Sequence, residues 1–359
     1  MSVFQKVVIK VGTNVLTRED GLLDMTNISH LVDQVAHLKN KGIEVILVSS
    51  GAVGAGRATF KVPGGLSRVV QRQVLSAIGQ VRLMEVYRQL FGNYQLYCAQ
   101  VLATKEDFRD RQHYLNMRNC FDALLRDHVV PVVNENDVVA VTELMFTDND
   151  ELAGLVAAMT NADALIILSS VDGLLDGPPE KADSKVIPLI DPADPAWLEY
   201  ILPSRSSFGR GGMHTKFRVA QKAAKVGIAT FIANGRRVGI LEDILAGQGI
   251  STCFQASDPL SNVKKWIAYN ELGYKGKVFI NEGAADVLLS QERVSSLLPV
   301  GIIRLEGTFE KGDLLSIYQE NGERIGLGIA QYDSDTALAY LGQQGQKELV
   351  HYDYLVIDR

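Results

Sequence analysis

Residues 6–13 read K-V-V-I-K-V-G-T and give the first indication of the fold. Val7, Val8 and Ile9 form a short apolar run rich in β-branched residues, which is typical of a strand buried on both faces of a parallel sheet. Lys10 interrupts this run, and strand interiors avoid unpaired ammonium groups. We therefore expect Lys10 to lie at the carboxyl end of a buried strand, where open α/β sheets bind their ligands. The alternative is a lysine that extends from the strand end into solvent.

Glycine-rich loops follow the first two predicted strands. Gly12 and Thr13 come directly after Lys10 and supply backbone that can approach an anion closely, with a hydroxyl beside it. After the second strand, residues 49–57 read S-S-G-A-V-G-A-G-R, a loop whose N–H groups can face a ligand. The glycine spacing, G-x-x-G-x-G, matches neither the dinucleotide fingerprint nor the G-x-x-x-x-G-K-[ST] phosphate loop. A Rossmann oxidoreductase and a P-loop enzyme are both disfavoured.

Strands and helices alternate over the first 250 residues. Short apolar runs predict buried strands at residues 44–48, 96–102, 129–133, 164–168 and 228–233. Apolar residues at helical spacing predict helices at residues 26–40, 74–90, 114–126, 151–159, 216–226 and 241–245. This alternation predicts an α/β fold, a three-layer sandwich in which helices cover both faces of a mainly parallel sheet.

The pattern changes near residue 250, and a chain of 359 residues is too long for one ordinary core. From residue 275 onward, short strands alternate with turns, including an N-G turn at Asn321 and Gly322, which predicts a small β-barrel. We therefore expect a first domain at residues 1–250, a linker at 251–274 and a second domain at 275–359.

Polar residues gather where buried strands end. The predicted strand 129–133 runs directly into N-E-N-D at residues 134–137, which should lie at the carboxyl end of the sheet, with an ordinary polar turn as the alternative. Residues 147–150 read T-D-N-D and precede an apolar helix. A single residue is enough to cap that helix, so the other polar side chains suggest a second role.

Residues 209–216 read G-R-G-G-M-H-T-K and precede another predicted helix. Glycines, a hydroxyl and a lysine at a helix N-terminus make an anion site, because free N–H groups and the helix dipole both favour negative charge. A flexible hinge is the alternative.

The composition, with 47% hydrophobic and 22% charged residues, is that of a globular protein. A formal net charge of −6 offers no global attraction to nucleic acid or to an anionic membrane. Cys98, Cys120 and Cys253 are widely spaced and form no C-x-x-C pair. This argues against a disulfide framework or a zinc site and favours the cytoplasm. We expect no signal peptide and no membrane span.

Five ordered segments make the chain resemble the glutamate 5-kinases, or γ-glutamyl kinases, in the form that joins an amino acid kinase domain to a C-terminal PUA domain. The segments are I-K-V-G-T from Ile9, V-S-S-G-A-V from Val48, N-E-N-D from Asn134, D-N-D from Asp148 and G-G-M-H-T-K from Gly211. The match covers essentially the whole chain, and its order and spacing are highly specific. It implies an amino acid kinase fold for residues 1–250 and a PUA-like barrel for residues 275–359.

The resemblance also implies roles for individual residues. Lys10 and Lys216 would neutralise the transferring phosphoryl group, and Asp150 would hold these two lysines in place. The residues that would bind the amino acid substrate are Ser50, Gly51, Asp137 and Asn149. Gly12 and Gly51 would offer N–H groups to phosphoryl oxygens. The residues that would contact ATP are Lys10, Gly12, Ser169, Ser170, Gly211, Gly212, Met213, His214, Thr215 and Lys216.

The implied reaction is transfer of the γ-phosphoryl group of ATP to the side-chain carboxylate of L-glutamate, which gives L-glutamyl 5-phosphate in the first step of proline synthesis. A carboxylate is ionised near neutral pH, so the reaction needs no general base. Positioning and charge neutralisation then carry the catalysis. Members of the family need Mg²⁺, which we expect to be bound mainly through the ATP phosphates rather than by protein ligands.

The resemblance implies partners as well. Family members commonly form homo-oligomers, dimers or tetramers, and are often inhibited by proline at the glutamate site. Functional coupling to γ-glutamyl phosphate reductase, the glutamate-5-semialdehyde dehydrogenase, is also implied. The chain departs from the family pattern at Ser170, Leu175 and Arg210, where relatives commonly carry Asp, Tyr and a small residue, so the nucleotide contacts of this chain need not follow the family.

Two alternative functions stay open at this point. One is a different small-molecule kinase of the same superfamily, acting on aspartate, N-acetylglutamate or UMP; N-E-N-D and the appended barrel argue against it. The other is an RNA-binding or RNA-modifying protein that acts through the PUA domain. Residues 275–359 carry a net charge of −5. This argues against RNA binding, since nucleic-acid binders carry a basic surface.

Overall fold

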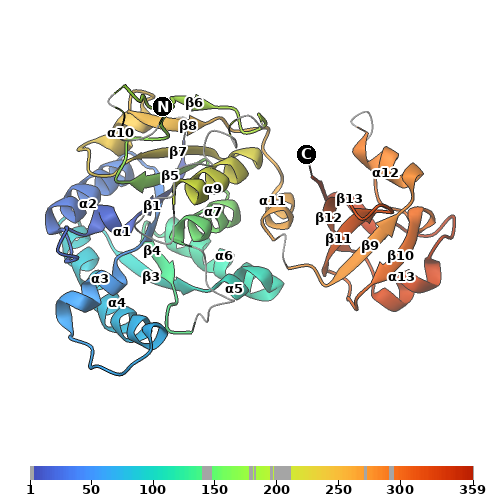
Figure 1. Cartoon of the computed structure of the whole chain (residues 1–359), viewed down its shortest axis with the longest axis horizontal. Helices are drawn as coiled ribbons and strands as arrows, with labels where there is room; N and C mark the ends of the chain where they lie inside the picture. The colour runs from blue at the N-terminus through green and yellow to red at the C-terminus, as the bar shows by residue number, and fades with distance from the viewer. Residues whose placement is uncertain are drawn as a thin grey trace. The chain divides into compact units, whose positions relative to one another are not determined.

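The computed structural model describes residues 4–139, 148–177, 181, 183–194, 197, 212–270, 273–290 and 295–358. The chain forms two compact units, Met1–Pro259 and Leu260–Arg359 (Figure 1). Each unit has a sheet and a hydrophobic core of its own.

The first unit is built on a sheet with the strand order β3-β4-β2-β1-β5-β7-β8-β6. Its strands are β1 (Lys6–Val11), β2 (Glu44–Ser49), β3 (Cys98–Ala103), β4 (Val130–Glu135), β5 (Ala164–Ser169), β6 (Leu189–Ile190), β7 (Ala229–Asn234) and β8 (Ser251–Phe254). From β3 to β7 all neighbours are parallel, and β8 pairs antiparallel with β7. The predicted α/β architecture with a mainly parallel sheet is confirmed.

Helices cover both faces of this sheet. They are α1 (Thr13–Leu16), α2 (Met25–Asn40), α3 (Ala52–Thr59), α4 (Arg68–Gly92), α5 (Lys105–Arg109), α6 (Arg111–Arg126), α7 (Asn149–Thr160), α9 (Met213–Lys225) and α10 (Ile240–Leu245). In Figure 1, α2 lies on one side of the sheet, and α7 and α9 lie on the other. No helix in the described part of the chain is both long enough and apolar enough to cross a membrane.

The alternation of side chains along β1 decides which residues face which helices. Val7, Ile9 and Val11 belong to the buried cluster that includes the apolar faces of α2, α4 and α10. Because successive strand residues point to opposite faces, Lys10 lies on the face covered by α7 and α9. The sheet therefore directs one charged side chain toward the start of these two helices.

Residues 251–274 were expected to form a linker, but much of this range belongs to regular elements of the two units. Residues 251–254 form β8, which extends the sheet of the first unit, and residues 262–269 form helix α11 (Asn262–Tyr269) of the second unit. The division between the units falls at Pro259 and Leu260. The short run S-T-C-F becomes a strand because β7 offers it an edge on which to pair, with Phe231 opposite Cys253.

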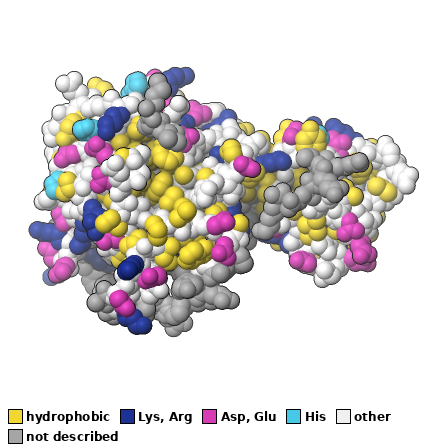
Figure 2. All heavy atoms as spheres, turned by 90° about the horizontal axis from the view of Figure 1, so that it is seen from above, with side chains coloured by type: hydrophobic (Ala, Val, Ile, Leu, Met, Phe, Trp, Pro, Cys, Tyr) yellow, Lys and Arg dark blue, Asp and Glu magenta, His cyan; other side chains and the backbone are white. Residues whose placement is uncertain are grey.

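The second unit holds a five-stranded sheet in the order β10-β9-β11-β12-β13. Its further elements are β9 (Gly276–Ile280), α12 (Glu282–Leu289), η1 (Pro299–Gly301), β10 (Ile302–Glu306), β11 (Leu314–Gln319), β12 (Arg324–Ala330), α13 (Ser334–Tyr340) and β13 (Val350–Ile357). The predicted turn at Asn321 and Gly322 joins β11 to β12, and Gly322 has a φ of 86°. Figure 2 shows acidic side chains at several places on the visible face of this unit, with basic ones beside them.

Helices α3 and α4 pack so closely that two glycines are required between them. A Cβ atom on Gly79 would lie 1.8 Å from the Ala52 carbonyl oxygen, and one on Gly56 would lie 2.0 Å from the Leu75 carbonyl oxygen. This contact sets the loop after β2 against the face of α4 that carries Arg72 and Ser76.

We predict that Gly79→Ala lowers the free energy of unfolding by about 2–3 kcal/mol, because the new methyl group overlaps backbone that cannot move alone. Gly92→Ala is the matched control on the same helix, since nothing lies within 4 Å of a Cβ atom there; it should be neutral or stabilise by up to about 1 kcal/mol. Urea denaturation of both variants measures the difference. Equal stability of the two would show that α3 and α4 are not packed as described.

Candidate active site

A buried carboxylate with two lysines lies at the carboxyl edge of the first sheet. The Asp150 side chain is fully buried near the start of α7. One oxygen forms an ion pair with Nζ of Lys10 from β1, and the other lies 2.8 Å from Nζ of Lys216 in the first turn of α9. The structure thus brings together three residues that are far apart in the sequence, each of which the sequence analysis selected.

Local sequence explains why α7 begins where it does. Asp148 is the N-cap residue, and its Oδ1 accepts hydrogen bonds from the N–H groups of Asp150, at 2.8 Å, and Glu151, at 3.3 Å. A carboxylate at this position satisfies free N–H groups of the first turn. Asn149 and Asp150 follow the cap directly, so the helix start presents two polar side chains to the edge of the sheet.

The two lysines change the electrostatics of Asp150 and Asp148 in opposite ways. Burial alone would raise the pKa of Asp150, but Lys10 and Lys216 outweigh it and lower that pKa to about 2. Asp148 forms no ion pair with a lysine in the part of the chain that the structure describes, and burial and the neighbouring Asp150 raise its pKa to about 6. Two ammonium groups on one carboxylate leave a net positive charge, which suits an anion such as a phosphoryl group.

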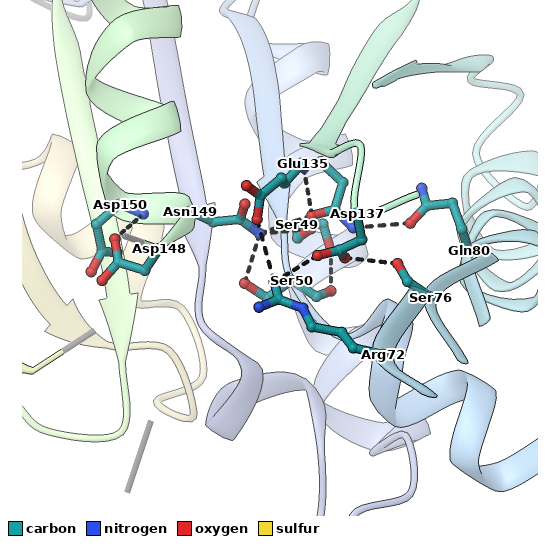
Figure 3. A network of polar contacts seen from close by, with 11 residues as sticks. Ser49, Ser50, Arg72, Ser76, Gln80, Glu135, Asp137, Asp148, Asn149 and Asp150 are labelled. Carbon is teal, nitrogen blue, oxygen red and sulfur yellow. Dashed lines mark hydrogen bonds and ion pairs between the residues drawn. The ribbon is translucent and has the colours of Figure 1, made fainter. Parts of the chain in front are cut away.

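Next to this pair lies a polar cluster that we call the acceptor cluster (Figure 3). Its members are Ser49, Ser50, Arg72, Ser76, Gln80, Asn134, Glu135, Asp137 and Asn149. Nδ2 of Asn149 donates to Oδ1 of Asn134 at 2.9 Å and to Oγ of Ser50 at 3.0 Å. Because Asn149 and Asp150 are consecutive, the acceptor cluster and the lysine pair adjoin.

These contacts determine which atoms are left for a ligand. The amide nitrogen of Asn149 is committed to protein oxygens, which leaves its Oδ1 as an acceptor. Oγ of Ser50 accepts from Asn149, so its own proton can be donated to a ligand oxygen. Asn149 and Ser50 thus offer a ligand one hydrogen-bond acceptor and one hydrogen-bond donor side by side.

Asp137 is held by α4. Its Oδ2 accepts from Oγ of Ser76 at 2.7 Å, and its Oδ1 lies 2.6 Å from NH2 of Arg72. Gln80, one further turn along the helix, accepts from Nδ2 of Asn134 at 2.9 Å. Sequence reasoning missed Arg72, Ser76 and Gln80, although their four-residue spacing places them on one helix face. A run of polar residues at that spacing within a predicted helix was the available signal.

Gly12 and Gly51, the two glycines expected to offer N–H groups to phosphoryl oxygens, differ in whether the N–H group already has an acceptor. The N–H of Gly12 donates to the Leu168 carbonyl at 3.1 Å, so the expectation that it faces a phosphoryl oxygen is wrong. A Cβ atom on Gly12 would lie 3.3 Å from the Leu168 carbonyl oxygen, a tight contact, and 3.7 Å from Nζ of Lys10, an ordinary one. Gly51 has a φ of 102°, a conformation that favours glycine, and in the described part of the chain its N–H has no acceptor.

The residues expected around the nucleotide come from two places. Ser169 ends β5 and Ser170 follows it, exposed. Gly212, Met213, His214 and Thr215 begin α9, where Gly212 caps the helix without a side chain. First-turn N–H groups of such a helix attract anions. Gly211, Arg210 and Thr147 lie outside the described residues.

Asp172, just after Ser170, is a residue that sequence reasoning did not select. Its carboxylate takes two hydrogen bonds of 2.7 Å from the guanidinium of Arg237 and one of 3.0 Å from Nδ2 of Asn234. The hydrogen bond with Arg237 lowers the pKa of Asp172. This contact ties the loop after β5 to the loop after β7. Leu175, in the same loop, forms an antiparallel bridge with Val186.

Possible metal ligands are few. Among the residues that the structure describes, no three His, Cys, Asp or Glu side chains form a group that could hold a metal ion. Oδ2 of Asp148 is a buried oxygen without a hydrogen-bond partner in the same part of the chain. A cation bound near the lysine pair would thus find at least one carboxylate oxygen of the protein.

Comparison with known proteins agrees with the geometry. The sequence matches the profile of the Amino acid kinase family over residues 5–234 and that of the PUA domain over residues 276–348. A glutamate 5-kinase of Chlorobaculum tepidum is 50% identical over 355 residues, which cover 99% of this chain and 98% of that protein. One of Bacteroides thetaiotaomicron is 48% identical over 358 residues, which cover 99% of each.

Solved structures share the fold of the first unit at low identity. Carbamate kinase from Giardia lamblia bound to AMP-PNP aligns with a TM-score of 0.52 at 19% identity and covers 71% of this chain and 100% of its own. UMP kinase from Ureaplasma parvum aligns with a TM-score of 0.50 at 16% identity and covers 70% and 99%. The match to the Amino acid kinase family over residues 5–234 shows that the chain is a kinase of this class. Within that class, the chain belongs to the glutamate 5-kinase family.

The raised pKa of Asp148 predicts a specific pH dependence of stability. Its folded-state pKa is about 6, above about 3.9 in the unfolded chain. The native state therefore binds this proton more tightly, and the resulting stability is present below pH 4 and lost as the pH rises through 6. Asp150 has the opposite sign: because its folded-state pKa is lowered to about 2, its stabilisation is present above about pH 4 and is lost as the pH falls through 2.

We predict that Asp148→Asn removes about 2 kcal/mol of the decline in the free energy of unfolding between pH 4.5 and 7.5. Asparagine keeps the oxygen that caps α7, so the fold should survive. Asp127→Asn, at an exposed carboxylate, is the matched control and should keep the wild-type slope. Urea titrations without ligands, at several pH values, measure how the free energy of unfolding of each variant depends on pH. An unchanged slope in Asp148→Asn would refute the assignment.

Proposed function

We propose that this protein transfers the γ-phosphoryl group of ATP to the γ-carboxylate of L-glutamate and so forms L-glutamyl 5-phosphate, the first step of proline biosynthesis. The single observation that carries the proposal is the start of α7. There Asn149 joins the acceptor cluster while the next residue, Asp150, joins Lys10 and Lys216. Full-length relatives named glutamate 5-kinase support the choice of glutamate as substrate.

Charge neutralisation is the main task of the protein in this reaction. The γ-carboxylate of glutamate is ionised near neutral pH and attacks without a general base. Lys10 and Lys216 compensate the negative charge that spreads over the transferring phosphoryl group. Asp150 fixes both ammonium groups before the substrates arrive, so little reorganisation is needed at the moment of transfer.

The acceptor cluster supplies complementary groups for the amino acid. The carboxylate of Asp137 suits the α-ammonium group, because opposite charges at close range favour both ionised forms. The Ser50 hydroxyl can donate to a carboxylate, and Oδ1 of Asn149 can accept from the ammonium group. These are the roles expected from the family resemblance. Both oxygens of Asp137 already have a neighbour, Ser76 or Arg72, so the ammonium group would use the further lone pairs of these oxygens.

ATP would lie near Ser169, Ser170 and the first turn of α9. Mg²⁺ would be held mainly by the ATP phosphates, with Oδ2 of Asp148 as a fitting protein ligand. When bound, the ion supplies further positive charge at the phosphoryl oxygens. We place Gly12 at this site because it lies beside Lys10, although its N–H donates to the Leu168 carbonyl.

We further propose a cytoplasmic homo-oligomer, a dimer or tetramer, inhibited by proline at the acceptor cluster. Free Cys98, Cys120 and Cys253 fit a reducing compartment. The labile acyl phosphate makes coupling to γ-glutamyl phosphate reductase advantageous. The second unit, with its acidic balance, would modulate activity or mediate assembly rather than bind RNA.

The reaction is tested with a substrate panel. Each of L-glutamate, L-aspartate, N-acetyl-L-glutamate and UMP is incubated with ATP and Mg²⁺ in the presence of hydroxylamine, which traps acyl phosphates as hydroxamates. We expect ATP turnover and hydroxamate with L-glutamate alone. Activity with another acceptor only would reject glutamate, and absence of activity with all four would reject the proposed function.

The role of the lysines is tested by Lys10→Ala and Lys216→Ala. We predict that each lowers kcat by about 10²–10³-fold while KM for glutamate changes by less than about threefold, since the lysines act mainly on charge in transfer. Lys225→Ala, an exposed lysine at the end of the same helix as Lys216, should behave as wild type. Normal kcat with a raised KM for glutamate would show that the lysines bind the acceptor instead.

A further inference from the structure

Arg72 is a cation in the acceptor cluster that the proposed reaction has not used. It lies in the first turns of α4, and its side chain is 30% exposed, so a ligand can reach it. Figure 3 shows the side chain pointing from α4 into the middle of the cluster, toward Glu135, Asp137 and Ser50. A partly exposed guanidinium at the centre of a polar site is suited to bind an anion.

The donors of Arg72 are only partly used. NH2 lies 2.6 Å from Oδ1 of Asp137 and 3.3 Å from Oε2 of Glu135. Nε and NH1 have no acceptor in the described part of the chain. Since a guanidinium presents its donors as a planar fork that matches a carboxylate, Arg72 keeps donors for a further anionic group.

Charge complementarity identifies that anion. Glutamate carries two carboxylates and one ammonium group, whereas the acceptor cluster contains the acidic Glu135 and Asp137. If the γ-carboxylate faces the phosphoryl group that Lys10 and Lys216 hold, and the ammonium group lies at Asp137, the α-carboxylate still needs a cation. Among the described members of the acceptor cluster, Arg72 is the cationic side chain.

Distance supports the same pairing. The α-ammonium and α-carboxylate of an amino acid are attached to a single carbon atom. Their partners must therefore be neighbours, as Arg72 and Asp137 are, with 2.6 Å between NH2 and Oδ1. Ser76 fixes the second oxygen of Asp137 from the same helix, so α4 presents the two charges as one unit.

We propose that Arg72 binds the α-carboxylate of the amino acid substrate and thereby selects an α-amino acid over an acceptor that lacks this group. This inference rests on the proposed glutamate kinase activity and adds a specificity-determining residue to it. The competing role is a positioning one, in which Arg72 only orients Asp137 and never touches the substrate.

Two analogues of glutamate separate these roles. Glutarate lacks the α-ammonium group, and 4-aminobutyrate lacks the α-carboxylate. Dissociation constants of L-glutamate, glutarate and 4-aminobutyrate are measured by calorimetry on the full chain, so that turnover of the analogues is not required. The variants are Arg72→Met and Asp137→Asn, with Arg82→Met as matched control, an exposed arginine of the same helix paired with Glu85.

We expect Arg72→Met to weaken L-glutamate and glutarate by about 10–100-fold, as for loss of a charged hydrogen bond, and to leave 4-aminobutyrate within about twofold. Asp137→Asn should weaken L-glutamate and 4-aminobutyrate, which carry the ammonium group, and should leave glutarate unaffected. Arg82→Met should change none of the three. Arg72→Lys keeps the positive charge but not the planar fork of donors, so it should weaken L-glutamate and glutarate less than Arg72→Met does. This second variant keeps the proposal testable if Arg72→Met impairs folding.

The proposal is overturned if Arg72→Met weakens L-glutamate and 4-aminobutyrate alike and spares glutarate, because Arg72 would then act only through Asp137. It is also overturned if no ligand is affected. Rejection of the proposed kinase activity can be told apart from rejection of the role of Arg72, because in the former case the unmutated protein would form no hydroxamate from L-glutamate.

Discussion

The ion pairs of Asp150 with Lys10 and Lys216 are the interaction on which the rest of the site depends. A buried carboxylate without partners would cost about 3–5 kcal/mol, and a buried lysine without one would cost a similar amount. Together the three groups compensate one another and still leave a positive charge. The ion pairs that stabilise these buried groups therefore also suit a phosphoryl group, because its negative charge compensates the remaining positive charge.

The start of α7 joins the two halves of the site. Asp148 caps the helix, Asn149 contacts the acceptor cluster, and Asp150 contacts the lysines. Three consecutive residues thus fix the relative position of the lysine pair and the acceptor cluster through backbone alone. A small change in the helix start would move both together, which in the proposed reaction would keep the reacting groups aligned.

Sequence reasoning predicted much of this arrangement. Buried strands can be read from β-branched runs, and polar residues directly after them, such as Lys10 and Asp137, must lie at the carboxyl edge of a parallel sheet. It did not predict Arg72, because the face that α4 turns to the sheet is set by contact with α3 through Gly56 and Gly79. Nor could it predict that Leu168 accepts from Gly12 or that β8 pairs with β7, since strand register depends on tertiary contacts.

In the proposed reaction, Lys10 and Lys216 meet at the transferring phosphoryl group while Asp150 holds both. A crystal structure with MgADP, L-glutamate and aluminium fluoride, a mimic of the phosphoryl group in transfer, tests it most directly. We expect hydrogen bonds from both Nζ atoms to fluoride, with both ion pairs to Asp150 retained. A mimic bound away from the two lysines, or a lysine that has left Asp150, would contradict it.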